Sequence, residues 1–372
     1  MRFDIERSER PLDEDRRRAV LKAPKFGQTF SDHMVTVDYD PNQGWHNGRV
    51  RPLAPLQLHP GTAALHYAQE VFEGMKAYRR DDNTIVLFRV DRHAQRLNDS
   101  LQRMSMPVLP EGMLAEALDA LLAADGTWVP DGPHRSLYLR PFVFATDSAL
   151  GGSRPSKNYM FVLIASPTTS TYSTETAMSV WLCKNYVRAT AGGTGAAKAG
   201  ANYAGALLGL QEAEANGCDQ AIWLDAKERR YVEEAGAMNL FFVYGNGPDA
   251  RLVTPELTGT FLPGITRDSI LQLAPTLGFR VDTGHVSIDQ WRDDALSGAI
   301  TETFACGTAA IVVNIGEVRA ENEKFLIADG KPPSNSIAVQ LRDALLGIQF
   351  GSRPDPFGWI RLVDQPATAA TT

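Results

Sequence analysis

One polar stretch constrains the architecture of this chain more than any other feature of its sequence. Residues 166–176 read SPTTSTYSTET, which has no apolar periodicity and is typical of a linker between two folded parts. A chain of 372 residues is also long enough for two domains of about 150 residues each. The sequence therefore predicts a smaller N-terminal domain at 1–165, a linker at 166–178 and a larger C-terminal domain at 179–372.

The order of the expected strands and helices predicts the fold class. Strands are expected at 84–90, 136–146, 159–165, 179–187, 220–224, 231–234, 239–244, 300–305 and 310–315, and helices at 111–124, 200–215 and 267–277. Because strands and helices do not alternate regularly, the pattern favours an α+β or mixed α/β fold over a doubly wound parallel sheet.

The charge and the apolar pattern exclude two classes of partner. The chain has 37 Lys and Arg against 44 Asp and Glu, and its net charge of −7 has the wrong sign for binding a nucleic-acid backbone. Its longest apolar segment, 160–165, is far shorter than the ~20 residues that cross a bilayer. The charged segment Arg2–Arg18 mixes both signs, which indicates a solvated arm rather than a signal peptide. We therefore expect neither a nucleic-acid nor a membrane partner.

The three cysteines indicate a reducing compartment. Cys183, Cys218 and Cys306 are an odd number, lie far apart and form no C-x-x-C pair. This pattern argues against a disulfide framework and against a structural zinc site. We expect a cytoplasmic protein without a bound metal.

The most informative segment for chemistry is 192–203, which reads GGTGAAKAGANY. Lys198 is the only charged residue between Arg188 and Glu212, and it lies among glycines and alanines where a loop is expected to enter a helix. Burial disfavours the charged form of lysine, and the neutral amine is the nucleophile of carbonyl chemistry. The segment indicates a Schiff-base lysine. A lysine that extends to solvent from a glycine-rich loop fits the same pattern.

The glycines around Lys198 match neither of two phosphate-binding motifs. A P-loop needs Gly-Lys followed by Ser or Thr, whereas Ala197 precedes Lys198 and Ala199 follows it. The dinucleotide motif G-x-G-x-x-G, counted from Gly193, places Lys198 at its last glycine position. A nucleotide-dependent oxidoreductase is therefore disfavoured.

Two turns offer donors for an anion. Gly264 and Thr266 precede an expected helix, whose first N–H groups favour negative charge. Gly307 and Thr308 lie between two expected strands and offer a second set of donors. An ordinary threonine N-cap and a plain turn explain the same residues.

Glu234 is a candidate partner for a cation. In the expected strand 231–234 the side chains of Glu233 and Glu234 point to opposite faces, and Glu234 shares its face with Val232, which favours burial. A buried carboxylate can keep a pyridinium nitrogen protonated. An ordinary salt bridge is the alternative.

Tyr138 and Arg140 form a candidate carboxylate site. They share one face of the expected strand 136–146, and Pro141 suggests that this strand lies at an edge or ends there. An exposed cross-strand pair fits the pattern equally well.

The chain resembles the branched-chain amino acid aminotransferases, which are pyridoxal 5'-phosphate enzymes of fold type IV, from about Thr29 to Leu362. The matching blocks appear in the family's order. They are HYAQEVFEGMKAY at 66–78, QRL at 95–97, SLYLRP at 136–141, GGTGAAKAGANY at 192–203, EAGAMN at 234–239, LPGITR at 262–267 and CGTAA at 306–310.

The resemblance implies a two-domain architecture with pyridoxal 5'-phosphate at the domain interface, and it assigns a role to each matching residue. Lys198 would be the catalytic residue that binds the cofactor covalently, Tyr203 would bind the cofactor's phenolic oxygen, and Glu234 the pyridine nitrogen. The phosphate would be bound by Arg96, Ile265, Thr266 and Thr308. The substrate would contact Phe72, Tyr138, Arg140 and Ala309, with Tyr67 and Leu150 from the other subunit of a homodimer.

The activity implied is transamination between leucine, isoleucine or valine and 2-oxoglutarate. A D-amino-acid aminotransferase or an aminodeoxychorismate lyase is the alternative within the same fold. A non-catalytic protein that binds a phosphorylated ligand through the Gly264 and Thr308 turns is the alternative from another class, and it would be colourless. Ala237 stands where some relatives have threonine, so one polar contact near the substrate is in doubt.

Overall fold

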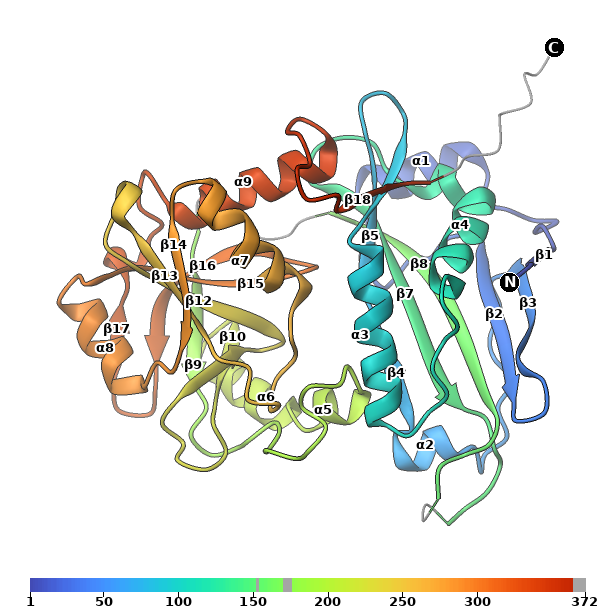
Figure 1. The fold of residues 1–372 in the computed structure, drawn as a ribbon, viewed down its shortest axis with the longest axis horizontal. Coiled ribbons are helices and arrows are strands. Elements are labelled where there is room, and N and C mark those ends of the chain that lie inside the picture. Colours follow the sequence, from blue (N-terminus) through green and yellow to red (C-terminus); the bar gives the residue numbers. More distant parts are fainter. Residues whose placement is uncertain (152–153, 170–175, 364–372) are drawn as a thin grey trace. The chain divides into compact units, whose positions relative to one another are not determined.

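The computed structural model describes residues 1–151, 154–169 and 176–363, which form two compact units (Figure 1). Unit 1 comprises the described parts of Met1–Thr169, Ala197–Gly200 and Gly347–Thr372, and unit 2 comprises those of Ser170–Ala196 and Ala201–Leu346. Each unit is built on a nine-stranded sheet. Among the described residues, no helix is both long enough and apolar enough to cross a membrane.

The division into units differs in two places from the boundaries expected from the sequence. Ala197–Gly200 and the segment from Gly347 onward belong to unit 1, although both lie within 179–372. Of the expected linker, 166–169 belongs to a strand of unit 1, and 170–175 lies outside the described residues. Local composition indicates a linker but does not reveal which later segments pack back onto the first unit.

Unit 1 contains a sheet with the strand order β1-β3-β2-β8-β7-β5-β6-β18, in which β4 also pairs with β7. Its strands are β1 (Asp4–Ile5), β2 (His33–Asp40), β3 (Gly44–Pro52), β4 (Glu70–Phe72), β5 (Met75–Arg79), β6 (Ile85–Phe88), β7 (Arg135–Ala145), β8 (Tyr159–Thr169) and β18 (Ile360–Leu362). Its helices are α1 (Glu14–Lys22), α2 (Ala63–Tyr67), α3 (Val90–Arg103) and α4 (Met113–Asp125). Between these strands the pairing is antiparallel, except that β1 runs parallel to β3.

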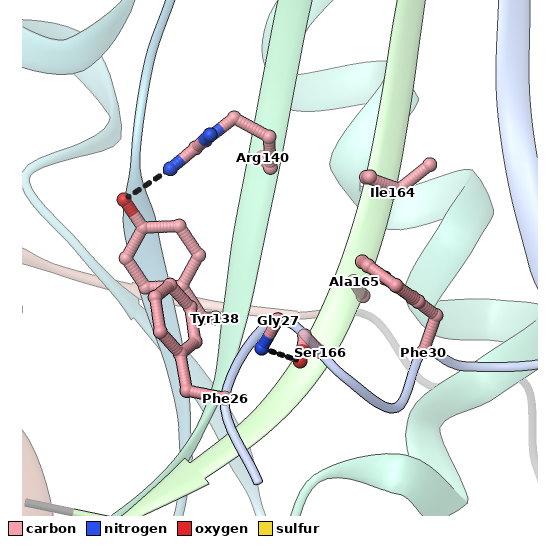
Figure 2. A pocket seen from close by; sticks show the side chains of 8 residues that line it. All are labelled: Phe26, Gly27, Phe30, Tyr138, Arg140, Ile164, Ala165 and Ser166. Carbon is pink, nitrogen blue, oxygen red and sulfur yellow. Dashed lines mark hydrogen bonds between the residues drawn. The ribbon is translucent and has the colours of Figure 1, made fainter. Parts of the chain in front are cut away.

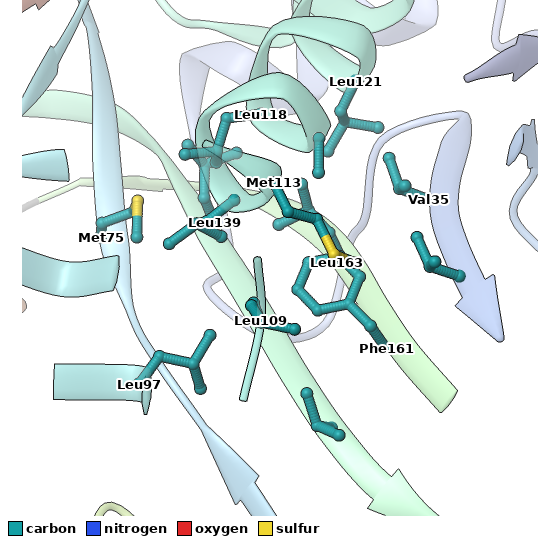
Figure 3. Packing of buried hydrophobic residues seen from close by; sticks show 14 of the residues in the cluster. Val35, Met75, Leu97, Leu109, Met113, Leu118, Leu121, Leu139, Phe161 and Leu163 are labelled. Carbon is teal, nitrogen blue, oxygen red and sulfur yellow. The ribbon is translucent and has the colours of Figure 1, made fainter. Parts of the chain in front are cut away.

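Helix α4 covers the core of unit 1. Its sequence is rich in Ala and Leu, which favour a helix, and Met113, Leu118 and Leu121 are buried against the sheet. Figure 3 shows these side chains packing with Phe161 of β8 and with Leu97 of α3. This core fixes α3 beside β4, which places both elements for the site described below.

One local expectation for unit 1 is wrong and another is confirmed. Pro141 does not mark an edge or an end, because β7 continues to Ala145 and pairs with β8 along its whole length. On the other side of β7 the partner changes from β5, which ends its pairing at Leu139, to β4, which begins at Phe142, so the missing N–H of proline breaks no ladder. The charged segment Arg2–Arg18 contains β1 and most of α1. It is nevertheless solvated, since α1 has no buried residue.

Unit 2 contains the sheet order β11-β10-β9-β16-β15-β12-β13-β14, with β17 paired to β16. Its strands are β9 (Met178–Leu182), β10 (Gln220–Leu224), β11 (Val232–Ala235), β12 (Met238–Tyr244), β13 (Arg251–Pro255), β14 (Arg280–Gly284), β15 (Ile300–Gly307), β16 (Ile311–Arg319) and β17 (Lys324–Leu326). Its helices are α5 (Gly200–Ala204), α6 (Leu207–Ala215), α7 (Ile265–Thr276), α8 (Ile288–Leu296) and α9 (Ile337–Phe350), and α9 crosses the unit boundary at Gly347. Because β11 also pairs with β12, six of these strands close into a ring.

Two elements of unit 2 are shorter than the sequence predicts. The helix expected at 200–215 is divided into α5 and α6, because Gly205, a poor helix former, lies between them. The strand expected at 179–187 ends at Leu182. Beyond Leu182 the chain leaves the sheet, and the Asn185 side-chain amide donates to Glu212 of α6.

Candidate active site

The backbone around Lys198 is fixed by three hydrogen bonds within unit 1. The Lys198 N–H donates to Ser100 Oγ at 3.0 Å, and the Lys198 carbonyl oxygen accepts from the Phe72 N–H at 2.9 Å. Two residues later, the Gly200 N–H donates to Glu70 Oε1 at 2.7 Å. Helix α3 supplies the serine and strand β4 supplies the other two residues, so the position of Lys198 is set by two packed elements.

The Lys198 side chain lies where a neutral amine is favoured. Its neighbours Ala197 and Ala199 are buried in the core of unit 1, and its Nζ lies 5.0 Å from the centroid of the Phe72 ring. Burial, together with the positive charge of Arg96, lowers the pKa of Lys198 from its usual value to about 8. At pH 7 about a tenth of such amines is neutral, far more than of an ordinary lysine with a pKa of about 10.4, so Lys198 can act as a nucleophile or a base.

Tyr138 and Arg140 lie together on one face of β7, as the alternation of the strand predicts. An Arg140 Nη2 hydrogen donates to the Tyr138 hydroxyl at 3.2 Å, and the guanidinium carbon of Arg140 lies 4.7 Å from the centroid of the Phe72 ring. The Tyr138 hydroxyl takes the place of a side chain at Gly74, since a Cβ there would lie 1.8 Å from this oxygen. The pair is therefore part of a packed site and not an exposed surface pair.

A cavity of about 280 Å³ opens beside this pair, as Figure 2 shows. It combines apolar and aromatic walls with one cation and two hydroxyls. The lining residues are Phe26, Gly27, Phe30, Tyr138, Arg140, Ile164, Ala165 and Ser166. Such a lining can hold an apolar side chain and can also bind a carboxylate at the guanidinium.

The segment that carries Phe26 and Phe30 was missed from the sequence. The Phe26 ring meets the Tyr138 ring edge-on, with centroids 4.8 Å apart. The Gly27 N–H donates to Ser166 Oγ at 3.0 Å and attaches this segment to β8. The available signal was two phenylalanines around a glycine in an otherwise polar stretch, which local patterns alone do not connect to β7.

Tyr67 and Leu150 do not line this cavity. Both are exposed, with 44% of the Tyr67 surface and 70% of the Leu150 surface accessible. The Gly151 N–H donates to the Tyr67 hydroxyl at 2.8 Å, which joins the end of α2 to the loop after β7. The two expected residues thus lie near each other on the surface of unit 1.

In unit 2, Glu234 is buried on β11 beside a cation. Its Oε1 lies 2.5 Å from Arg188 Nη2, which also donates to the Thr260 carbonyl oxygen at 3.1 Å. The arginine thus supplies a counter-charge for a buried carboxylate. The sequence identified Glu234 but not Arg188, because the two lie far apart along the chain.

The face of β11 that carries Glu233 is buried as well as the face that carries Glu234. Both Glu233 and Glu234 are buried. Glu233 Oε1 accepts hydrogen bonds from Thr260 Oγ1 at 2.5 Å and from Thr258 Oγ1 at 3.4 Å. Two adjacent carboxylates therefore have different partners, one cationic and one neutral.

The expected phosphate-binding residues of unit 2 lie near the ends of neighbouring strands. Glu234 pairs in register with Asn239, and Asn239 pairs with Cys306 close to the β15–β16 turn that carries Thr308 and Ala309. The Asn239 amide donates to the Leu262 carbonyl oxygen at 3.0 Å. The same side chain leaves no room for a Cβ at Gly264, the residue before α7.

Ile265 and Thr266 are buried in the first turn of α7. Gly264, and not a threonine, occupies the N-cap position, so no N-cap side chain accepts from the first N–H groups of the helix. These N–H groups and the Thr266 hydroxyl are suitable donors for an anion. Tyr203 is half-buried on α5. In the described part of the chain, no group of three or more His, Cys, Asp and Glu could hold a metal ion.

Comparison with known proteins finds relatives along nearly the whole chain. The chain is 51% identical to the branched-chain-amino-acid aminotransferase of Mycobacterium tuberculosis, over 97% of this chain and 98% of that protein. It is 50% identical to the protein of the same name from Mycolicibacterium smegmatis, with the same coverage.

Solved structures of branched-chain amino acid aminotransferases share the fold. The Escherichia coli enzyme superposes with a TM-score of 0.73 at 27% identity, covering 90% of this chain and 99% of that one. A second enzyme of this name, complexed with N-(5'-phosphopyridoxyl)-L-glutamate, gives a TM-score of 0.70 at 27% identity, covering 88% and 98%. The family model for amino-transferase class IV matches residues 70–318. The chain therefore belongs to the amino-transferase class IV family.

Proposed function

We propose that this protein transfers the amino group between leucine, isoleucine or valine and 2-oxoglutarate, with pyridoxal 5'-phosphate as its cofactor. The observation that carries the proposal is the position of Lys198. Its amine has a pKa of about 8, and both this amine and the Arg140 guanidinium contact the Phe72 ring. The similarity to branched-chain-amino-acid aminotransferases supports the substrate class. The products would be the branched-chain 2-oxo acids and glutamate.

The residues present fit the cofactor. Its aldehyde reacts with a neutral amine, and the lowered pKa of Lys198 makes this form accessible near pH 7. Its pyridine nitrogen needs a buried carboxylate, and we assign Glu234 to it. Its phenolic oxygen is assigned to Tyr203. We assign its phosphate to Arg96, Ile265, Thr266 and Thr308, since a guanidinium, hydroxyls and the first N–H groups of a helix suit an anion.

The chain's own residues then divide the reaction among them. Pyridoxal 5'-phosphate, when bound, supplies the electron sink that makes the α-proton of an amino acid removable. The Lys198 amine would take this proton and return it to the carbon next to the cofactor's ring. Phe72 and the aromatic cavity wall bind the apolar side chain of leucine. Arg140 and the Tyr138 hydroxyl bind the side-chain carboxylate of glutamate, and Ala309 contacts the substrate.

We further propose a cytoplasmic homodimer in which Tyr67 and Leu150 contact the substrate of the other subunit. Their exposure supports this assignment, because large apolar side chains at a surface often mark an interface. The three cysteines are free thiols, in agreement with a reducing compartment.

The pKa of Lys198 predicts how its reactivity depends on pH. In the cofactor-free protein, acylation of Lys198 should rise through pH 8, because the lowered pKa exposes the neutral amine there. An unhindered lysine reference in the same solution should rise only near its pKa of about 10.4. Competitive labelling at a series of pH values, read by peptide mass spectrometry, measures both. A Lys198 profile that coincides with the reference would contradict the lowered pKa.

Glu234→Gln tests the assignment of the pyridine nitrogen. The variant should keep the fold and the cofactor but lose most of the turnover, since an uncharged ring is a weaker electron sink. Glu233→Gln is the matched control, because it removes the same charge from the adjacent residue, where the partners are threonines. It should keep its turnover even if its melting temperature falls. Equal loss of turnover in both variants would remove the assignment.

Arg140→Met tests how one cavity accepts two kinds of side chain. The variant should weaken glutamate and 2-oxoglutarate by about 1.5–3 kcal/mol, the worth of a hydrogen bond to a charged group. Leucine should remain within a few-fold of its wild-type rate in its own half-reaction. Single-turnover kinetics of each half-reaction separate the two effects. An equal loss with leucine and glutamate would show that Arg140 binds a group common to both substrates.

A further inference from the structure

The Glu73 carboxylate, which has no role in the proposed mechanism, is surrounded by hydrogen-bond donors. Its side chain is fully buried. Oε1 accepts from Arg96 Nε at 2.5 Å, and Oε2 accepts from Arg96 Nη2 at 2.9 Å. Oε2 also accepts from His93 Nδ1 at 2.8 Å and from the Gly74 N–H at 3.0 Å. One carboxylate thus receives four donors, two of them from the same guanidinium.

The local fold places these groups together. Glu73 lies in the short turn between β4 and β5, and its own N–H donates to the Pro141 carbonyl oxygen at 2.8 Å. His93 and Arg96 are three residues apart on α3, so both side chains lie on the face that meets this turn. Ser100, one turn further along α3, accepts the Lys198 N–H. The cluster therefore lies on the helix face that also positions Lys198.

The charges of the cluster follow from burial and pairing. Burial raises the pKa of Glu73, but Arg96 and His93 together outweigh it and hold this pKa well below its usual range. Burial lowers the pKa of His93, so its ring is neutral near pH 7 and donates through Nδ1–H. One cation and one anion remain, joined by two parallel hydrogen bonds. Such a two-point contact fixes the plane of a guanidinium, which a single bond does not.

A buried ion pair of this kind is a weak source of stability, because the cost of desolvating both charges offsets their attraction. Its most direct consequence is geometric. The charge of Arg96 contributes to the lowered pKa of the Lys198 amine. An arginine in this position could otherwise adopt many rotamers, and each would present a different edge.

We propose that Glu73 is a positioning residue that holds the Arg96 guanidinium, with His93 and Gly74 completing the carboxylate's hydrogen bonds, so that Arg96 receives the phosphate of pyridoxal 5'-phosphate. This inference rests on the proposed function, which assigns that phosphate to Arg96. Glu73 acts through Arg96 and does not itself touch the cofactor.

A neutral amide cannot replace this carboxylate. In Glu73→Gln the side chain keeps its size, but its nitrogen carries hydrogens that would face the hydrogens of Arg96 or His93. At least one of the donors then loses its acceptor, and the guanidinium loses its two-point contact. The change therefore alters the orientation of Arg96 without opening a cavity.

The test compares two ligands of the cofactor-free, full-length protein: pyridoxal 5'-phosphate, and pyridoxal, which lacks the phosphate. Dissociation constants for both are measured by fluorescence titration. Glu73→Gln should weaken pyridoxal 5'-phosphate by about tenfold or more, as expected when a charge-assisted contact is lost. Pyridoxal, which makes no phosphate contact, should change by less than about threefold. The readout is the dissociation constant of pyridoxal divided by that of pyridoxal 5'-phosphate. This ratio falls when the phosphate contact is lost, and general destabilisation does not change it.

Three further variants make the outcome specific. Glu302→Gln changes another buried carboxylate, which binds the Ser336 hydroxyl and the first N–H groups of α9 in unit 2. It should leave the ratio unchanged even if the protein is less stable. Arg96→Lys should lower the ratio, because an ammonium cannot reproduce the guanidinium's fork. His93→Phe removes a single donor and should lower the ratio by about two- to fivefold, which keeps the test available if Glu73→Gln does not fold.

The results separate the inference from the function on which it rests. If Arg96→Lys lowers the ratio but Glu73→Gln and His93→Phe do not, the positioning role is overturned and the phosphate assignment stands. If Arg96→Lys also leaves the ratio unchanged, the assignment of the phosphate to Arg96 fails first. If Glu73→Gln weakens both ligands equally, Glu73 supports the fold alone, and the inference is overturned.

Discussion

The hydrogen bonds that attach the backbone of Ala197–Gly200 to unit 1 are the constraint on which the site depends. Ser100 accepts from the Lys198 N–H, Phe72 donates to the Lys198 carbonyl oxygen, and Glu70 accepts from the Gly200 N–H. A reacting amine must be held within a fraction of an ångström of its productive position, which a mobile glycine-rich loop would not achieve. These bonds supply that rigidity and direct the side chain to the Phe72 ring.

Two buried arginines are each paired with a carboxylate of their own unit. Arg96 is paired with Glu73 in unit 1, and Arg188 is paired with Glu234 in unit 2. Removing one member of such a pair leaves a buried charge uncompensated, at a cost of about 3–5 kcal/mol. Each unit can therefore fold with cations and carboxylates already in place for a charged cofactor. The pairs also fix side-chain orientation, which explains why an ion pair is used where an apolar pair would stabilise the fold equally well.

The sequence predicted the parts of the site that local rules govern. Strand alternation placed Tyr138 and Arg140 on one face, and the position of Lys198 among small residues predicted an amine whose pKa burial lowers. The partners were missed where contact depends on distant segments. Arg188 is 46 positions before Glu234 in the numbering, and Phe26 meets Tyr138 only because its loop packs on β8. The division of the chain was also incomplete, because composition does not encode which segments return to the first unit.

The central claim is that Lys198 is the residue that binds the cofactor covalently. Borohydride reduction of the holoenzyme makes this bond permanent, and proteolysis followed by mass spectrometry locates the pyridoxyl group. We expect the label on the peptide that contains Lys198, in a yield close to one per chain. The chain has eight other lysines, and a label on any of them in place of Lys198 would contradict the account.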